Sequence, residues 1–267
     1  MKDKIIFFSI AAIIIIVCIF FNKVEDKNTF LANSDSTLST TKIGWGIKRN
    51  DNHSQPDLGS KNKALIDKYN GIAMGNKDKK YVYLTFDEGY EAGYTDKILQ
   101  TLNENEVKAT FFITAHYLNT QPELVRKMIG EGHIVGNHTV NHKSMPTLSV
   151  DDIKKEVMNL HTAIYEKFGY EMKYIRPPMG EFSELSLSVT NNLGYTTVMW
   201  SFAYDDWNED NKGRQSYAKE KILSNIHPGC VMLLHGNSSD NCDILGDIIK
   251  EIKNMGYEFR SLEKFEK

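Results

Sequence analysis

The sequence predicts an α/β fold made of parallel βα units, arranged as a (β/α) barrel or as an open doubly wound sheet. Short β-rich runs alternate along the chain with helical patterns of about ten residues or more, which is typical of parallel sheets. The 267 residues, 41% of them hydrophobic and 25% charged, fit one large domain. This composition excludes collagen-like, low-complexity and wholly disordered proteins.

The N-terminal segment is expected to lie apart from that domain. Lys2 and Lys4 precede an apolar run from Ile5 to Phe21, which predicts a signal anchor over residues 1–24, with a cleaved signal peptide as the alternative. Residues 25–44 are rich in Asn, Ser, Thr and Lys, which indicates a flexible linker. The folded domain is therefore expected over residues 45–267, and its location is expected to be extracytoplasmic, either membrane-anchored or secreted.

The first half of the domain shows a regular alternation of strands and helices. Apolar, β-branched and aromatic runs predict strands, and apolar residues at helical spacing predict helices. In chain order these are a strand over Tyr81–Phe86, a helix over Thr95–Glu104, a strand over Ala109–Ile113, a helix over Pro122–Gly130 and an extended segment over His133–Gly136.

The second half continues the same alternation. Ser149 is the expected N-cap of a long helix that ends near Phe168, with Asp152 three residues on, and Gly194 is the expected stop of a helix over Ser183–Leu193. The remaining elements are extended segments over Lys173–Ile175 and Val198–Trp200, a buried strand over Cys230–Leu234, an amphipathic helix over Asp243–Met255 and a short strand over Tyr257–Phe259.

Net charge and cysteine content narrow the function further. The formal net charge of -3 provides no basic field for nucleic acid, so nucleic acid is not an expected partner. The three cysteines, Cys18, Cys230 and Cys242, are too few for a disulfide scaffold or a Cys-rich zinc module. A single bridge between Cys230 and Cys242 stays open, because the sequence does not fix their geometry.

Chemically capable residues follow the predicted strands, where the loops of a parallel α/β fold converge. Asp87 and Glu88 come directly after the strand that ends at Phe86, and adjacent acids point in different directions. His138 and His142 are four residues apart, so on a helical turn they would share a face. With one carboxylate they would form the two-histidine, one-acid set of a catalytic divalent metal.

Three later segments carry further candidates. Arg176 precedes two prolines, which hold it out of helical geometry, so its planar fork can meet a carboxylate. Asp206 lies in an Asp-Asp-Trp segment, and His235 ends the buried apolar strand. Each alone also fits a structural role, as a surface ion pair, a cap or a satisfied histidine.

Together these segments resemble a known family. The order TFDEGY, HTVNH, RPPMG, DDW and LLHG over residues 85–236 resembles the five motifs of the polysaccharide deacetylases, the NodB homology domain of carbohydrate esterase family 4. The resemblance covers about Tyr81 to Phe265. Residues 45–80 form an additional N-terminal segment, in which Trp45–Asn50, His53 and Pro56 resemble the branch that makes muramic delta-lactam in spore cortex.

The resemblance implies a distorted (β/α) barrel with an open groove for a glycan strand, and hydrolysis of a sugar acetamide. Asp87 matches the family's catalytic base, and Arg176 matches the cation that orients it and lowers its pKa. His235 matches the general acid that protonates the departing amine, and Asp206 matches the carboxylate that holds this imidazole.

The resemblance also implies a divalent metal cofactor, with Zn²⁺ as the expected ion. His138 and His142 match metal ligands. Glu88 stands where most of the family has Asp as the third ligand, so the sequence departs from the family pattern at this position. Substrate contacts are expected from Tyr90, the Met179 backbone, Trp207 and His53. The other histidines, His116, His133, His161 and His227, are expected to be packing or surface residues.

Three functions follow from this reading. The first is deacetylation of N-acetylmuramic acid in peptidoglycan without peptide stems, which leads to muramic delta-lactam in a Gram-positive spore former and depends on an amidase that removes the stems. The second is deacetylation of N-acetylglucosamine in peptidoglycan or chitin-like chains. The third is a membrane-tethered glycan-binding protein with weak or no turnover.

Overall fold

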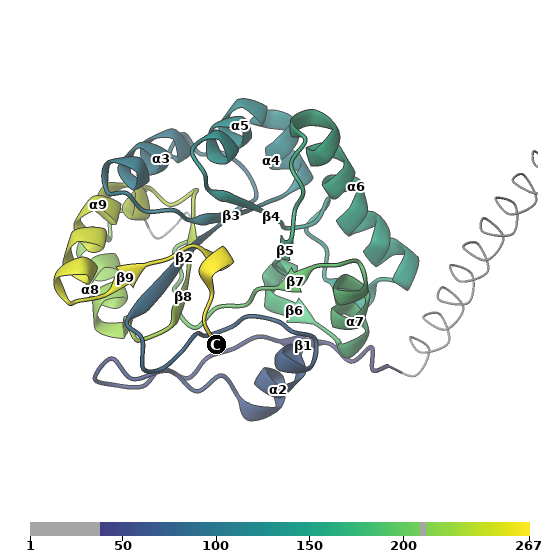
Figure 1. Cartoon of the computed structure of the whole chain (residues 1–267), viewed down its shortest axis with the longest axis horizontal. Helices are drawn as coiled ribbons and strands as arrows, with labels where there is room; N and C mark the ends of the chain where they lie inside the picture. The colour runs from purple at the N-terminus through teal and green to yellow at the C-terminus, as the bar shows by residue number, and fades with distance from the viewer. Residues whose placement is uncertain (1–37, 209–211) are drawn as a thin grey trace, which may run out of the picture. The chain divides into compact units, whose positions relative to one another are not determined.

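The centre of the molecule is a parallel β-sheet (Figure 1). A computed structural model describes residues 38–208 and 212–267, and Thr40–Lys267 form one compact unit. The strand order is β7-β5-β4-β3-β2-β8, and β9 pairs with the start of β2. The strands are β2 (Tyr81–Glu88), β3 (Thr110–Ile113), β4 (Ile134–Asn137), β5 (Tyr174–Ile175), β7 (Thr196–Thr197), β8 (Cys230–His235) and β9 (Glu258–Phe259).

Helices lie around the outer side of this sheet (Figure 1). They are α2 (Ser60–Lys68), α3 (Thr95–Glu104), α4 (Ala115–Thr120), α5 (Pro122–Gly130), α6 (Val150–Phe168), α7 (Glu184–Asn192), α8 (Gln215–Asn225) and α9 (Ser239–Asn254). Short 3₁₀ turns cover Met145–Thr147, Pro178–Gly180 and Leu262–Lys264. This arrangement confirms the predicted α/β architecture of parallel βα units.

The sheet forms a half-barrel whose two edges are joined by irregular backbone. After β7 the chain runs beside β8, where Phe202 forms a parallel bridge with Met232. Hydrogen bonds from Ser201 N to Val231 O (2.9 Å) and from Leu233 N to Phe202 O (2.8 Å) hold this contact. The expected barrel is therefore strongly distorted on this side, because the segment after β7 makes too few ladder bonds to form a regular strand.

Local signals in the sequence located most elements correctly. The Ser149 hydroxyl accepts a hydrogen bond from Asp152 N (3.1 Å), as expected of the N-cap of α6. Gly194 follows α7 with a φ of +89°, which suits glycine. Strand β2 continues beyond the predicted end at Phe86 and includes Asp87 and Glu88. Helices α4 and α8 were not predicted.

The compact unit begins earlier than residue 45. Ile43 and Gly44 form strand β1, which pairs antiparallel with Phe182 and Glu181 of β6 (Glu181–Phe182). The prediction of a flexible linker is thus wrong for these residues, because this pairing fixes their backbone. The predicted membrane segment 1–24 and linker residues 25–37 lie outside the described residues. Within the described part, no helix is long and apolar enough to cross a membrane.

Cys230 and Cys242 are both buried and both free, so the disulfide that the sequence left open is absent. Cys230 lies in β8, and burial raises the pKa of its thiol to about 12. The thiol is therefore a buried, unreactive group.

Glycine at position 136 allows the close packing at the centre of the sheet. Gly136 of β4 is the register partner of Phe112 in β3, and a Cβ added to Gly136 would lie 2.5 Å from the Phe112 ring. The Phe112 ring also contacts a candidate site residue, because the Arg176 guanidinium lies 4.3 Å from the centre of the ring.

We therefore expect Gly136→Ala to lower the free energy of unfolding by about 1–3 kcal/mol, the usual cost of overpacking a core. Urea denaturation would measure the change. Gly130→Ala is the matched control, because nothing lies within 4 Å of its added Cβ. Equal stability of Gly136→Ala and the wild type would show that Phe112 can move aside.

Candidate active site

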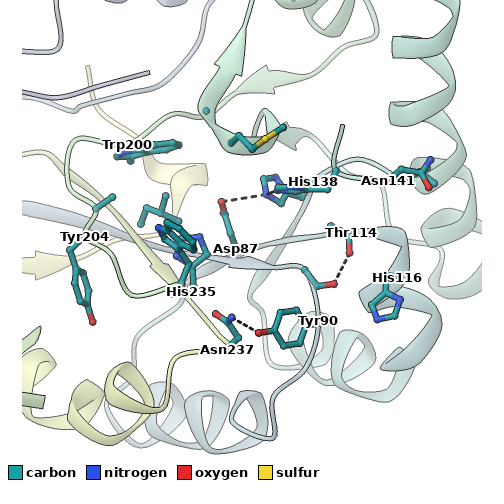
Figure 2. A pocket seen from close by; sticks show the side chains of 18 residues that line it. Asp87, Tyr90, Thr114, His116, His138, Asn141, Trp200, Tyr204, His235 and Asn237 are labelled. Carbon is teal, nitrogen blue, oxygen red and sulfur yellow. Dashed lines mark hydrogen bonds and ion pairs between the residues drawn. The ribbon is translucent and has the colours of Figure 1, made fainter. Parts of the chain in front are cut away.

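Asp87 and His235 face the same cavity at the carboxyl end of the sheet. They are register partners in the parallel pair β2–β8, and register partners project to the same face. Both line a cavity of about 1160 Å³ (Figure 2). The predicted base and the predicted acid therefore lie at one cavity, as hydrolysis of an amide between them requires.

A buried ion pair holds the Asp87 carboxylate. Arg176 is fully buried, and its Nη1 donates to Asp87 Oδ1 (2.7 Å). The rest of its fork donates to Thr85 Oγ1 (2.9 Å) and to the backbone carbonyls of Val198 (3.1 Å) and Met199 (3.4 Å). The guanidinium is thus fixed in one orientation against the carboxylate.

This environment keeps Asp87 ionised. Burial alone would raise the pKa of Asp87, but the positive charge of Arg176, with smaller contributions from His138 and His235, outweighs it and lowers that pKa. The carboxylate is therefore available as a proton acceptor at neutral pH.

His235 is held by a second carboxylate. Its Nδ1 lies 2.8 Å from Asp206 Oδ1, and its backbone N–H donates to Asp206 Oδ2 (2.8 Å). Burial lowers the pKa of His235, but the charge and hydrogen bond of Asp206 outweigh it, so the net effect raises that pKa. The Asp206 contact occupies Nδ1, which leaves Nε2 as the ring nitrogen available for proton transfer.

His138 and His142 meet, but not through a helical turn. They lie in a loop after β4, where Thr139 and His142 have φ values of +68° and +53°. The predicted helical geometry is thus wrong, and these left-handed residues bend the chain instead. The two Nε2 atoms are 3.2 Å apart, and His138 Nε2 is 3.5 Å from Asp87 Oδ2.

The histidine pair suits a divalent cation. His138 Nδ1 lies 2.9 Å from the Arg176 carbonyl, which can only accept, so Nδ1 carries the proton and Nε2 keeps its lone pair. Burial lowers the pKa of His138 to about 4 and also lowers that of His142, so both are neutral at pH 7. Two neutral imidazoles with adjacent Nε2 atoms can coordinate a divalent cation.

Comparison with known proteins agrees with this geometry. Residues 74–198 match the family model of the polysaccharide deacetylases. The chain is 43% identical over 222 residues to the peptidoglycan-N-acetylmuramic acid deacetylase PdaA of Bacillus subtilis, covering 83% of this chain and 84% of the relative. The chain belongs to the polysaccharide deacetylase family.

Two further comparisons place it within that family. The structure of B. subtilis PdaA, a family 4 carbohydrate esterase, superposes with a TM-score of 0.83 at 41% identity, covering 85% of this chain and 98% of that structure. A peptidoglycan-N-acetylglucosamine deacetylase of Bacillus cereus is 33% identical over 202 residues, covering 74% of this chain and 72% of the relative. As a polysaccharide deacetylase the protein is a hydrolase, and its half-barrel is that of the NodB domain.

The structure does not place Glu88 with the histidine pair. Glu88 follows Asp87 on the same strand, so its side chain leaves the opposite face, where it is 1% exposed. Its carboxyl group packs over Gly236, where an added Cβ would lie 2.0 Å from Oε1. The expected three-ligand set is therefore not assembled, and no cluster of three such groups occurs among the described residues.

The environment of Glu88 also disfavours an ionised carboxylate. Neither of its oxygens has a hydrogen-bond partner within the described part of the chain. Burial, followed by the negative charges of Glu91 and Asp87, raises the pKa of Glu88 well above its ordinary value of 4.5. The protonated form is therefore favoured in the folded protein.

The predicted substrate contacts divide into two groups. Tyr90, Met179 and Trp207 all line the cavity with exposed side chains, as expected of a sugar-binding rim. His53 does not line it. Its Nδ1 instead lies 2.8 Å from the carbonyl of Ile226, so the structure places His53 outside this cavity.

Sequence reasoning missed two residues that support the site from helices. Glu156 of α6 is buried and accepts hydrogen bonds from the backbone N and Nδ2 of Asn141 (both 2.7 Å), which fixes the loop between the two histidines. Asn241 of α9 donates to Asp206 Oδ2 (2.6 Å) and accepts from the Tyr204 hydroxyl. Neither lies at a strand end, so only a buried polar residue on an amphipathic helix could have signalled them.

A titration of stability tests the placement of Glu88. Because its folded-state pKa is raised, the folded protein binds more protons than the unfolded chain once the pH exceeds 4.5, so stability falls as pH rises. Glu88→Gln cannot titrate. In metal-free protein, we expect the free energy of unfolding to fall less between about pH 5 and pH 8 in Glu88→Gln than in the wild type. Parallel curves in urea denaturation would contradict the assignment of a buried, protonated Glu88.

Proposed function

We propose that the protein is an exported peptidoglycan N-deacetylase that hydrolyses the acetamide of N-acetylmuramic acid residues lacking peptide stems. The observation that carries the proposal is the pair of dyads, Asp87 with Arg176 and Asp206 with His235, which open onto one cavity. Support for the muramic substrate comes from the 43% identity to PdaA over most of both chains.

The two dyads supply the proton transfers of amide hydrolysis. Asp87 accepts a proton from the water whose oxygen attacks the acetamide carbonyl carbon, and Arg176 keeps that carboxylate ionised and oriented. His235 donates a proton from Nε2 to the sugar nitrogen as the C–N bond breaks. The products are acetate and a free amine.

Two further groups complete the reaction site. Asp206 holds the His235 ring and keeps it protonated to higher pH, so the acid carries the proton that it transfers to the departing amine. Met179 lines the cavity with a φ of +58°, a left-handed conformation that turns the backbone at this point. Its N–H is the proposed donor to the developing oxyanion.

His138 and His142 are the proposed ligands of a divalent cation, with Zn²⁺ as the first candidate. A cation bound there would polarise the carbonyl and lower the pKa of its water. Glu88 is left out of this proposal, because its side chain lies on the opposite face of β2.

The proposed product is a precursor of the muramic delta-lactam of spore cortex. The new amine on C2 and the lactyl carboxyl on O3 belong to one sugar, so ring closure to muramic delta-lactam is favoured by proximity. The substrate then requires an amidase that first removes the peptide stem. We also propose that the protein acts outside the cytoplasm of a Gram-positive spore former and that residues 1–24 attach it to the membrane.

Turnover on defined glycans tests the function. We expect the wild type to deacetylate stem-free peptidoglycan strands to muramic acid or its lactam, detected by mass spectrometry, and Asp87→Asn to lose about a hundredfold or more in rate because the base is removed. Asp205→Asn is the control, because Asp205 is half-exposed, pairs with Arg214 and does not line the cavity. Glucosamine as the product would favour the N-acetylglucosamine deacetylase, and glycan binding without turnover would favour the binding protein.

Metal content is a separate prediction. We expect the purified domain to bind about one divalent ion per chain, and chelation to abolish activity until Zn²⁺ is restored. His142→Ala should lose the ion in elemental analysis, whereas His161→Ala should keep it, because His161 bonds to the Tyr195 hydroxyl away from the cavity. Full activity of a domain shown to be metal-free would contradict this assignment.

A further inference from the structure

One wall of the cavity carries a histidine outside the five motifs. His116 is the second residue of α4, the helix that follows β3, and its exposed side chain lines the cavity. It lies on the same side as Thr114 and Asn141 (Figure 2). The expectation that His116 is a packing or surface residue therefore misses its position in the site.

The imidazole of His116 differs from the other protonatable groups of the cavity in being uncommitted. Within the described residues, its side chain has no hydrogen bond or ion pair with another residue. Five of the other such groups have hydrogen-bond or ion-pair partners in the protein, namely Asp87, Tyr90, His138, Tyr204 and His235. The sixth, His142, is a proposed metal ligand beside His138.

The neighbouring polar side chains are engaged as well. The Thr114 hydroxyl donates to the carbonyl of Gly89 (3.0 Å), and the Asn141 amide donates to Glu156 (2.7 Å). The described lining contains no lysine or arginine, and its one carboxylate, Asp87, is neutralised by Arg176. His116 is thus a lining side chain that can present an uncommitted imidazole N–H.

The proposed substrate needs such a group. In stem-free N-acetylmuramic acid, the O3 lactyl group ends in a free carboxylate and stands beside the C2 acetamide. When the acetamide reaches Asp87 and His235, that carboxylate must enter the same cavity, where an unpaired charge is unfavourable. A peptide stem converts the carboxylate to a neutral amide, and N-acetylglucosamine has only a hydroxyl at O3.

We infer that His116 binds the lactyl carboxylate of the stem-free muramic residue and so contributes to selection of that sugar. The inference rests on the proposed function and deepens it. It gives a physical reason why strands without stems would be preferred. An imidazole N–H binds a carboxylate more strongly than it binds a neutral amide.

The test compares kcat/KM on stem-free strands with kcat/KM on the same strands after conversion of the lactyl carboxylates to carboxamides. In the wild type we expect a preference for the free acid. His116→Leu should reduce this ratio about tenfold or more, the usual loss when a hydrogen bond to a charged group is removed. His116→Gln, which keeps an N–H donor, should recover part of it.

His53→Leu is the matched control, since His53 is an exposed histidine outside the cavity. An unchanged ratio in both His116→Leu and His116→Gln, with muramic turnover intact, would overturn the inference and leave the proposed function standing. Absence of muramic acid or its lactam from wild-type digests would instead overturn the proposed function, and with it the role of His116.

Discussion

The site depends on one buried arginine. Arg176 is fully buried and links β2, β5 and the segment after β7 through a single guanidinium. Its carbonyl also fixes the ring of His138. An unpaired charge at this depth would be strongly destabilising, so the fold and the ionised state of Asp87 depend on the same contact. Stability and chemistry are therefore coupled at this residue.

Side-chain alternation at the ends of two strands decides which acids can react. Asp87 and His235 are register partners, so they share the cavity face. The next residues, Glu88 and Gly236, belong to the other face, where the absence of a side chain on Gly236 leaves room for the buried carboxyl. The Glu88 side chain, where the sequence departs from the family pattern, is thus accommodated on the face of β2 away from the cavity. The two dyads at the cavity are not disturbed by it.

Helices outside the motifs hold the catalytic loops in place. Glu156 braces the histidine loop from α6, and Asn241 braces Asp206 from α9. Both are polar residues on otherwise amphipathic helices, and each satisfies groups that would be costly to bury without a partner. This support explains how a loop with left-handed residues at Thr139 and His142 keeps one geometry.

The sequence by itself determined the βα alternation and the order of the five motifs, because periodicity and residue adjacency are local properties. The tertiary structure alone decided which face Glu88 takes, that His53 lies away from the cavity and that His116 lies on its wall. These outcomes depend on where a strand ends, which strand is its neighbour and how a loop bends. Such properties arise from pairing between distant segments, which no local pattern records.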